Sequence, residues 1–98
     1  MNIITEKKGE TLTIALEGRL DTTTAPQLEN EIGEKAVGIK EMTIDMTKLE
    51  YISSAGLRVL LSTHKKMSKA GSLKITGVCE EIMDVFEMTG FSDILNIE

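Results

Sequence analysis

Apolar residues recur along the chain at two different spacings, and these spacings predict strands and helices. Every second residue from Leu12 to Leu16 is apolar, as on a half-buried strand. From Ala25 to Ala36 the apolar residues instead recur every three or four positions, as on one face of a helix. The whole pattern predicts the order β-β-α-β-α-β-α-β, with strands at residues 3–6, 11–18, 42–46, 73–76 and 94–97 and helices at residues 25–37, 54–70 and 80–88.

This order predicts an α/β fold with one mixed sheet. In the second half of the chain strands alternate with helices, so these strands are expected to pair in parallel through right-handed crossovers. The first two strands are joined by Lys8-Gly9-Glu10, a predicted hairpin turn. A length of 98 residues is typical of one domain, here residues 1–98, and no linker or repeat divides it.

Polar residues at the element boundaries predict where the first helix starts and where one strand stops. Thr24 is expected to cap the first helix, with Pro26 in its first turn and Gln27 at the capping-box position. Residues 47–52 are expected to form a loop between the strand at 42–46 and the long helix.

Composition and charge exclude several classes of protein. The chain is 41% hydrophobic and 28% charged, which is ordinary for a globular domain. Its net charge of −5 and its three aromatic residues argue against direct binding of nucleic acid. No apolar run reaches the ~18–20 residues of a membrane span, and no signal peptide is recognisable, so a cytoplasmic location is expected. The single cysteine, Cys79, predicts neither a disulfide nor a zinc site.

Signatures of catalysis are also missing. The sequence has no phosphate-binding loop, no dinucleotide-binding glycine motif and no nucleophile elbow. His64 follows Ser54 by ten residues, which is about 15 Å along one helix and too far for a hydrogen bond. No catalytic residue, metal ligand or cofactor is therefore predicted.

Two polar segments stand out at the ends of predicted strands. Residues 18–24 follow one strand, and residues 51–56 precede the long helix. Open α/β sheets place their sites at this carboxyl edge. Ser53 or Ser54 would stand at a helix N-terminus, where free amides and the dipole favour a negative group. From these residues alone, the serine is either a simple helix cap or a site for a phosphoryl group.

Four segments in this order resemble the STAS domain family of anti-sigma factor antagonists, over nearly the whole chain. The family carries a Gly-x-Leu-Asp segment, an acidic end to a central strand, an aromatic-aliphatic-Asp-Ser-x-Gly-Leu phosphorylation motif, and a C-terminal Leu-Phe-acidic-x-Thr-Gly signature. The matching segments here are Gly18-Arg19-Leu20-Asp21-Thr22-Thr23-Thr24-Ala25, Asp45, Tyr51-Ile52-Ser53-Ser54-Ala55-Gly56-Leu57 and Val85-Phe86-Glu87-Met88-Thr89-Gly90-Phe91.

The resemblance implies a STAS-like fold, with helices mainly on one face of the sheet, and a partner-switching regulator. In this family the unphosphorylated antagonist binds an anti-sigma factor that is also a serine kinase, and so frees the sigma factor. The kinase, which holds the ATP, inactivates the antagonist by phosphorylation, and a PPM-type serine phosphatase restores it. The motif implies Ser54 as the phosphoacceptor, with Ser53 second because it stands where many members carry Asp. The implied contact residues are Asp21, Thr22, Thr24, Ser53, Ala55, Gly56 and Arg58.

Two other functions stay open at this stage. The Ser53 substitution is compatible with a STAS scaffold or ligand-binding module that is never phosphorylated. A small enzyme with Ser54 as its nucleophile would need a base that the sequence does not place nearby. The resemblance favours a free monomer that forms complexes with other proteins, and it leaves the sigma factor and the pathway unidentified.

Overall fold

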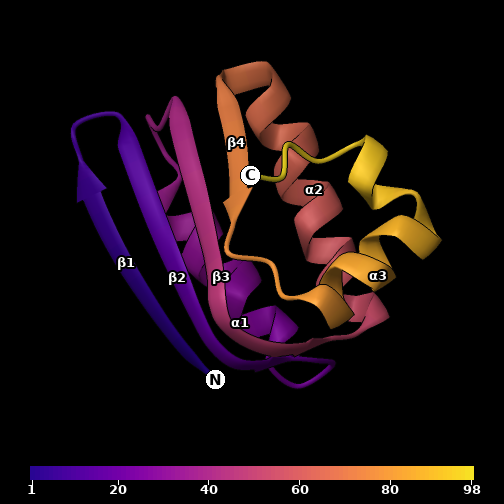
Figure 1. The fold of residues 1–98 in the computed structure, drawn as a ribbon. Coiled ribbons are helices and arrows are strands. Elements are labelled where there is room, and N and C mark those ends of the chain that lie inside the picture. Colours follow the sequence, from indigo (N-terminus) through magenta and orange to yellow (C-terminus); the bar gives the residue numbers. More distant parts are fainter.

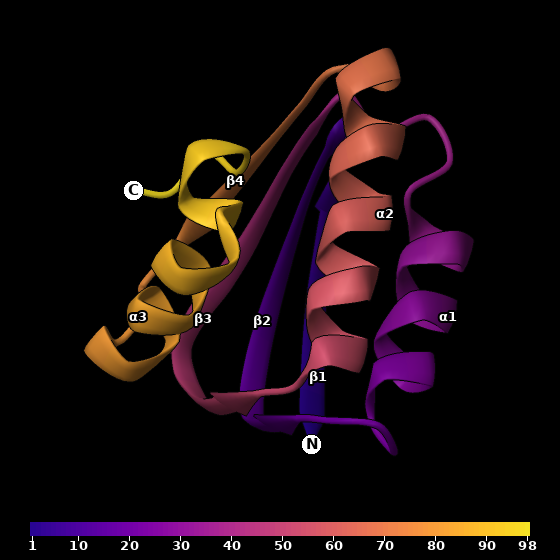
Figure 2. The ribbon, with the colours of Figure 1, turned by 90° about the vertical axis from the view of Figure 1, so that its right-hand side faces the viewer.

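The computed structural model describes all 98 residues as a four-stranded sheet with three helices packed on one of its faces (Figures 1 and 2). The strands follow the order β1-β2-β3-β4 across the sheet. The antiparallel β1-β2 hairpin turns at Gly9, whose φ of 62° suits glycine, and the other pairs are parallel. The predicted α/β fold with a mixed sheet is confirmed. Its elements are β1 (Asn2–Lys8), β2 (Thr11–Leu20), α1 (Ala25–Lys35), β3 (Glu41–Ile52), α2 (Ser54–Ala70), β4 (Ser72–Thr76), α3 (Glu80–Thr89) and a 3₁₀ turn at Phe91–Asp93.

The hydrophobic core lies between the sheet and the helices. Leu12, Ile14 and Leu16 are fully or almost fully buried on the helix-facing side of β2, as the two-residue spacing predicted. Leu28 from α1 and Phe86 from α3 are fully buried in the same core. The opposite face of the sheet carries no helix and is therefore open to solvent (Figure 2).

The longest helix, α2, has the bounds that the sequence predicted. It begins at Ser54 and ends at Ala70, and Gly71 closes it with an amide that donates to the Met67 carbonyl. It lies between α1 and α3 in the helical layer (Figure 2). None of the helices is both long and apolar enough to cross a bilayer.

The predicted loop at residues 47–52 is wrong, because β3 continues to Ile52. The pairing with β2 shifts register twice, between Ala15 and Glu17 and between Gly18 and Arg19. At each shift β3 contains an extra residue, as in a β-bulge. The buried residues Met46, Leu49 and Ile52 are consequently three positions apart, so the strand loses the two-residue spacing that reveals a strand in a sequence.

The predicted last strand at residues 94–97 is reduced to a single bridge. Ile97 pairs in parallel with Ile75 of β4, whose amide donates to the Asn96 carbonyl at 2.8 Å. The Glu98 amide donates back to the Ile75 carbonyl at 2.8 Å. The position and direction of the segment are as predicted, but the 3₁₀ turn before it leaves too few residues for a ladder.

Candidate functional site

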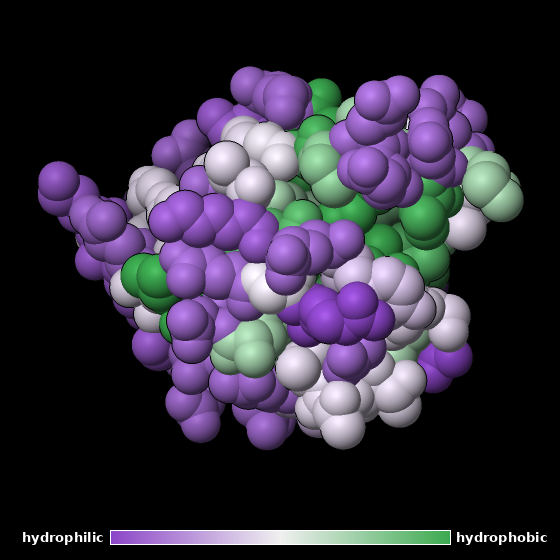
Figure 3. Space-filling model, turned by 60° about the horizontal axis from the view of Figure 1, so that its bottom comes forward, coloured by the Kyte–Doolittle hydropathy of each residue, from purple (hydrophilic) through white to green (hydrophobic).

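The two polar segments meet at the carboxyl edge of the sheet. β2 ends at Leu20 and β3 ends at Ile52, and the two residues are partners in neighbouring parallel strands. Just beyond them, the Ser53 amide donates to the Leu20 carbonyl at 2.9 Å. Figure 3, which turns this edge towards the viewer, shows a mostly hydrophilic or near-neutral surface with hydrophobic surface gathered to one side. The expected juxtaposition of residues 18–24 and 51–56 is thus present.

Asp21 organises the first of these segments. Its carboxylate accepts hydrogen bonds from the Thr23 hydroxyl at 2.7 Å, the Thr23 amide at 3.0 Å and the Thr24 amide at 3.1 Å. These bonds, led by that of the Thr23 hydroxyl, lower the pKa of Asp21 below its ordinary value. The carboxylate therefore stays ionised well into the acidic range and fixes the turn before α1.

Thr24 stands at the N-cap position of α1, but it does not cap the helix. Its hydroxyl donates to the Arg19 carbonyl and accepts from the Asp21 amide, both at 2.8 Å. No side chain caps the first turn of α1, so the predicted capping box with Gln27 is wrong. The hydroxyl instead forms its hydrogen bonds within the preceding turn, where it links the end of β2 to Asp21. Thr22, which follows Asp21 in this turn, is exposed.

Arg19 and Tyr51 form a pair beside this turn that the sequence analysis did not predict. The Arg19 guanidinium lies over the Tyr51 ring, 4.2 Å from its centroid, and its Nε lies 4.0 Å from an Asp21 carboxylate oxygen. The two residues are partners in the β2–β3 ladder. Only the register after the second bulge sets them opposite each other, and that register could not be read from the sequence.

The two serines at the start of α2 have different surroundings. Ser53 is the N-cap residue, it is half-buried, and its Oγ accepts a hydrogen bond from the Gly56 amide at 3.4 Å. Ser54 is the first helical residue, it is exposed, and its hydroxyl makes no hydrogen bond within the chain. Ser53 therefore stabilises the helix start, whereas the Ser54 hydroxyl is exposed and has no partner in the chain.

This difference predicts that two alanine substitutions have unequal effects on stability. Ser53→Ala removes the cap and should lower the free energy of unfolding by about 1 kcal/mol. Ser54→Ala removes no hydrogen bond and should change it by less than about 0.5 kcal/mol. Urea denaturation of both variants and the parent measures the two effects. Equal losses would show that both hydroxyls support the helix.

Gly56 allows α2 to begin directly against the ends of the two strands. A methyl group on its Cα would lie 2.7 Å from Leu20 Cγ and 2.9 Å from Ile52 Cγ1. Both side chains belong to the buried core, so any larger residue would overpack the first turn of α2. The glycine thus fixes the position of Ser53 and Ser54 relative to β2 and β3.

A shallow hollow extends from this edge between α1 and α2. It encloses about 330 Å³, and its lining includes Thr22 and Pro26 on one side and Ala55 and Arg58 on the other. Glu29 of α1 also lines it and is a residue that the sequence analysis missed. The structure therefore brings Thr22, Ala55 and Arg58 to one surface, while Asp21, Thr24, Ser53 and Gly56 shape the backbone behind it.

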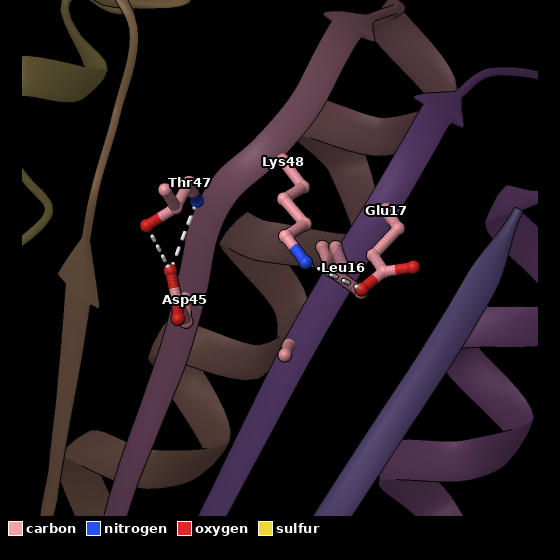
Figure 4. A pocket seen from close by; sticks show the side chains of 6 residues that line it. Leu16, Glu17, Asp45, Thr47 and Lys48 are labelled. Carbon is pink, nitrogen blue, oxygen red and sulfur yellow. Dashed lines mark hydrogen bonds and ion pairs between the residues drawn. The ribbon is translucent and has the colours of Figure 1, made fainter.

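A second hollow, of about 200 Å³, lies on the open face of the sheet, away from the helices (Figure 4). Lys48 and Glu17 form an ion pair across it at 3.6 Å, and Asp45 accepts hydrogen bonds from the hydroxyl and amide of Thr47. The Thr47 hydroxyl is the main reason that the pKa of Asp45 is lowered. Asp45 lies within β3 and not at its end, and its partners are already in the chain, so we assign no ligand to this hollow.

His64 and Cys79 both lie away from the N-terminus of α2, where Ser53 and Ser54 are located. His64 is half-buried in the third turn of α2, and Cys79 is the half-buried residue before α3. The Cys79 sulfur lies 4.0 Å from the Leu49 carbonyl oxygen and packs against the core. Neither residue is brought to Ser54, and no three acidic, His or Cys side chains gather in a group that could hold a metal ion.

The fold and site together define a class of protein: a small α/β domain with an exposed serine at the start of the helix after its third strand. The model of the STAS domain family matches residues 2–98, and the chain belongs to that family. The anti-sigma-B factor antagonist of Listeria monocytogenes is 33% identical over 104 residues, which cover the whole of this chain and 90% of that protein.

Solved structures share the fold. An anti-sigma factor antagonist from Mycobacterium paratuberculosis superposes with a TM-score of 0.88 at 24% identity, over 98% of this chain and 83% of that one. The Bacillus cell fate determinant SpoIIAA in its phosphorylated form superposes with a TM-score of 0.77 at 19% identity, over 99% of this chain and 91% of that one.

Proposed function

We propose that the chain is an anti-sigma factor antagonist that acts by partner switching in the cytoplasm. Its unphosphorylated form binds an anti-sigma factor that is also a serine kinase, and this releases the sigma factor. The kinase transfers a phosphoryl group from its own ATP to Ser54, which ends the binding, and a PPM-type serine phosphatase removes the group. The chain itself catalyses no reaction, needs no cofactor and is a monomer when free.

The observation that carries this proposal is the state of Ser54. Its hydroxyl is exposed, makes no hydrogen bond and stands at a helix N-terminus beside the edge where β2 and β3 end. The half-buried Ser53 is already engaged as the cap. Relatives over the full length of the chain are named anti-sigma-B factor antagonists, and SpoIIAA, which shares the fold, has a phosphorylated form.

A phosphoryl group on Ser54 is compatible with the fold. It adds about −1.5 to −2 charge next to the free amides of the first helical turn, where the dipole favours an anion. Arg58 is exposed one turn further along α2 and can pair with the group at the i, i+4 spacing. The modification should therefore leave the fold intact and change only the surface that the partner meets.

That surface comprises both segments at the sheet edge. Thr22, Ala55 and Arg58 line the hollow between α1 and α2 and are proposed to touch the anti-sigma factor. Asp21 and Thr24 hold the turn before α1 in shape. Ser53 and Gly56 set the start of α2, and thereby the position of Ser54.

The proposal is tested by a kinase assay. The purified chain is incubated with Mg-ATP and each serine-kinase anti-sigma factor of the same genome, and the peptide covering residues 51–58 is analysed by mass spectrometry. One phosphate on Ser54 is expected. Ser54→Ala should abolish it, and Ser53→Ala, the matched control, should keep it. Phosphate on Ser53 would move the site by one residue. No phosphate with any kinase would favour a STAS module that binds its partner constitutively.

A further inference from the structure

The charges of the chain are distributed unevenly, and α2 is its most positive element. This helix contains Arg58, Lys65, Lys66 and Lys69 and no Asp or Glu, so it carries a formal charge of +4 with its histidine neutral. Because the whole chain carries −5, the residues outside α2 carry −9. A solvated helix on an acidic protein would ordinarily carry charges of both signs.

These cations have no partner within the chain. The five ion pairs of the structure use Arg19, Lys35, Lys40, Lys48 and Lys74, and none of them involves α2. The helix dipole favours a cation near a C-terminus, which accounts for Lys69 in the last turn. It does not account for Arg58, which lies near the positive end of the same dipole.

Three of the cations share one helix face with Ser54. The steps from Ser54 to Arg58, from Arg58 to Lys65 and from Lys65 to Lys69 are four, seven and four residues, which keep the side chains on the same side of a helix. All four residues are exposed, although α2 lies between α1 and α3 in the helical layer (Figure 2). We call this face of α2, from Ser54 to Lys69, the cationic face.

We propose that the cationic face is a docking surface for an acidic surface of the anti-sigma factor, an inference that rests on the function proposed above. The face adjoins the proposed contact residues, because Arg58 belongs to both. A row of unpaired cations is electrostatically complementary to a partner surface that presents carboxylates. Electrostatic complementarity of this kind increases the rate of association.

The same arrangement explains how one phosphoryl group could have a large effect. Three cations on the face contribute +3, and a phosphoryl group on Ser54 adds about −1.5 to −2 at one end of it. The group also competes with the partner for Arg58 at the i, i+4 spacing. The phosphorylated face thus loses most of the positive charge that attracts an acidic partner.

The test compares two charge reversals of equal size. Lys65→Glu/Lys69→Glu reverses two cations of the face. Lys7→Glu/Lys8→Glu, the control, reverses two exposed lysines of the β1–β2 hairpin that also lack a carboxylate partner. Association with the purified anti-sigma factors is measured by stopped flow without ATP, at about 50 and about 300 mM salt. Thermal unfolding checks that each variant is folded. If Lys65→Glu/Lys69→Glu does not fold, Lys65→Gln/Lys69→Gln replaces it.

At the lower salt the reversal in α2 should slow association about tenfold or more, and the hairpin reversal less than about threefold. High salt should reduce the difference. Equal effects of both reversals, or no effect of either, would overturn the proposal. The proposal would also be overturned if Lys65→Glu/Lys69→Glu left association with the anti-sigma factor unchanged but abolished binding to phosphatidylglycerol vesicles. That result would indicate that the cationic face binds a membrane surface. If the unmodified chain binds no anti-sigma factor, the proposed function itself fails and the docking surface with it.

Discussion

Phosphorylation of Ser54 is expected to weaken binding of the anti-sigma factor about a thousandfold, which corresponds to ~4 kcal/mol. The added group is a dianion on an exposed residue next to Ala55, which lines the proposed contact surface. In the complex it would be desolvated opposite a partner that fits the uncharged hydroxyl, and burying an unmatched charge costs several kcal/mol. No change of fold is needed for an effect of this size.

Isothermal titration of the enzymatically phosphorylated and unmodified chains against the same anti-sigma factor measures this difference. Ser54→Ala should bind within about threefold of the unmodified chain, because its lost hydroxyl had no partner. Ser54→Glu carries one charge in place of nearly two and should weaken binding by an intermediate factor.

Two results would contradict this explanation of the switch. One is a loss of affinity of less than about tenfold on phosphorylation, since the change in binding free energy would then be too small for the expected switch. The other is a backbone rearrangement spread over the sheet, visible as amide chemical-shift changes far from Ser54. The first result would show that Ser54 lies outside the interface. The second would show that phosphorylation acts through a change of conformation.

The sequence predicted those parts of the fold in which hydrophobic spacing is regular. The bounds of α2 agree with the prediction because its buried residues, such as Leu60 and Met67, repeat at helical spacing over 17 residues. The meeting of residues 18–24 with residues 51–56 was predictable as well. It requires only that two neighbouring parallel strands end at the same edge of the sheet.

The parts that could not be predicted depend on contacts between segments far apart in the sequence. The bulges that lengthen β3 are defined by its pairing with β2, and they also place Arg19 over Tyr51. Thr24 is a good cap by residue type, yet its hydroxyl bonds the end of β2. Likewise, two adjacent serines look equivalent in a sequence, and the structure separates them by burial and by the hydrogen bond from the Gly56 amide to Ser53.

Phe86→Ala is expected to be the most destabilising of the substitutions considered, with a loss of about 3–5 kcal/mol in the free energy of unfolding. Phe86 is fully buried and is the largest side chain that α3 contributes to the core. Its removal leaves a cavity that its neighbours fill only in part. Since a domain of this size is commonly stable by about 5–15 kcal/mol, the variant should be close to unfolding at room temperature.

Met88→Ala provides the matched control in the same helix, because Met88 is 86% exposed and its truncation should cost less than about 0.5 kcal/mol. Urea denaturation of both variants gives the two values. A loss below about 1 kcal/mol for Phe86→Ala would show that α3 packs loosely and that the core depends on α1 and α2 alone. Because α3 carries none of the proposed contact residues, the folded fraction of Phe86→Ala should still bind the anti-sigma factor. Stability and partner binding are therefore expected to be separable by substitutions in different helices.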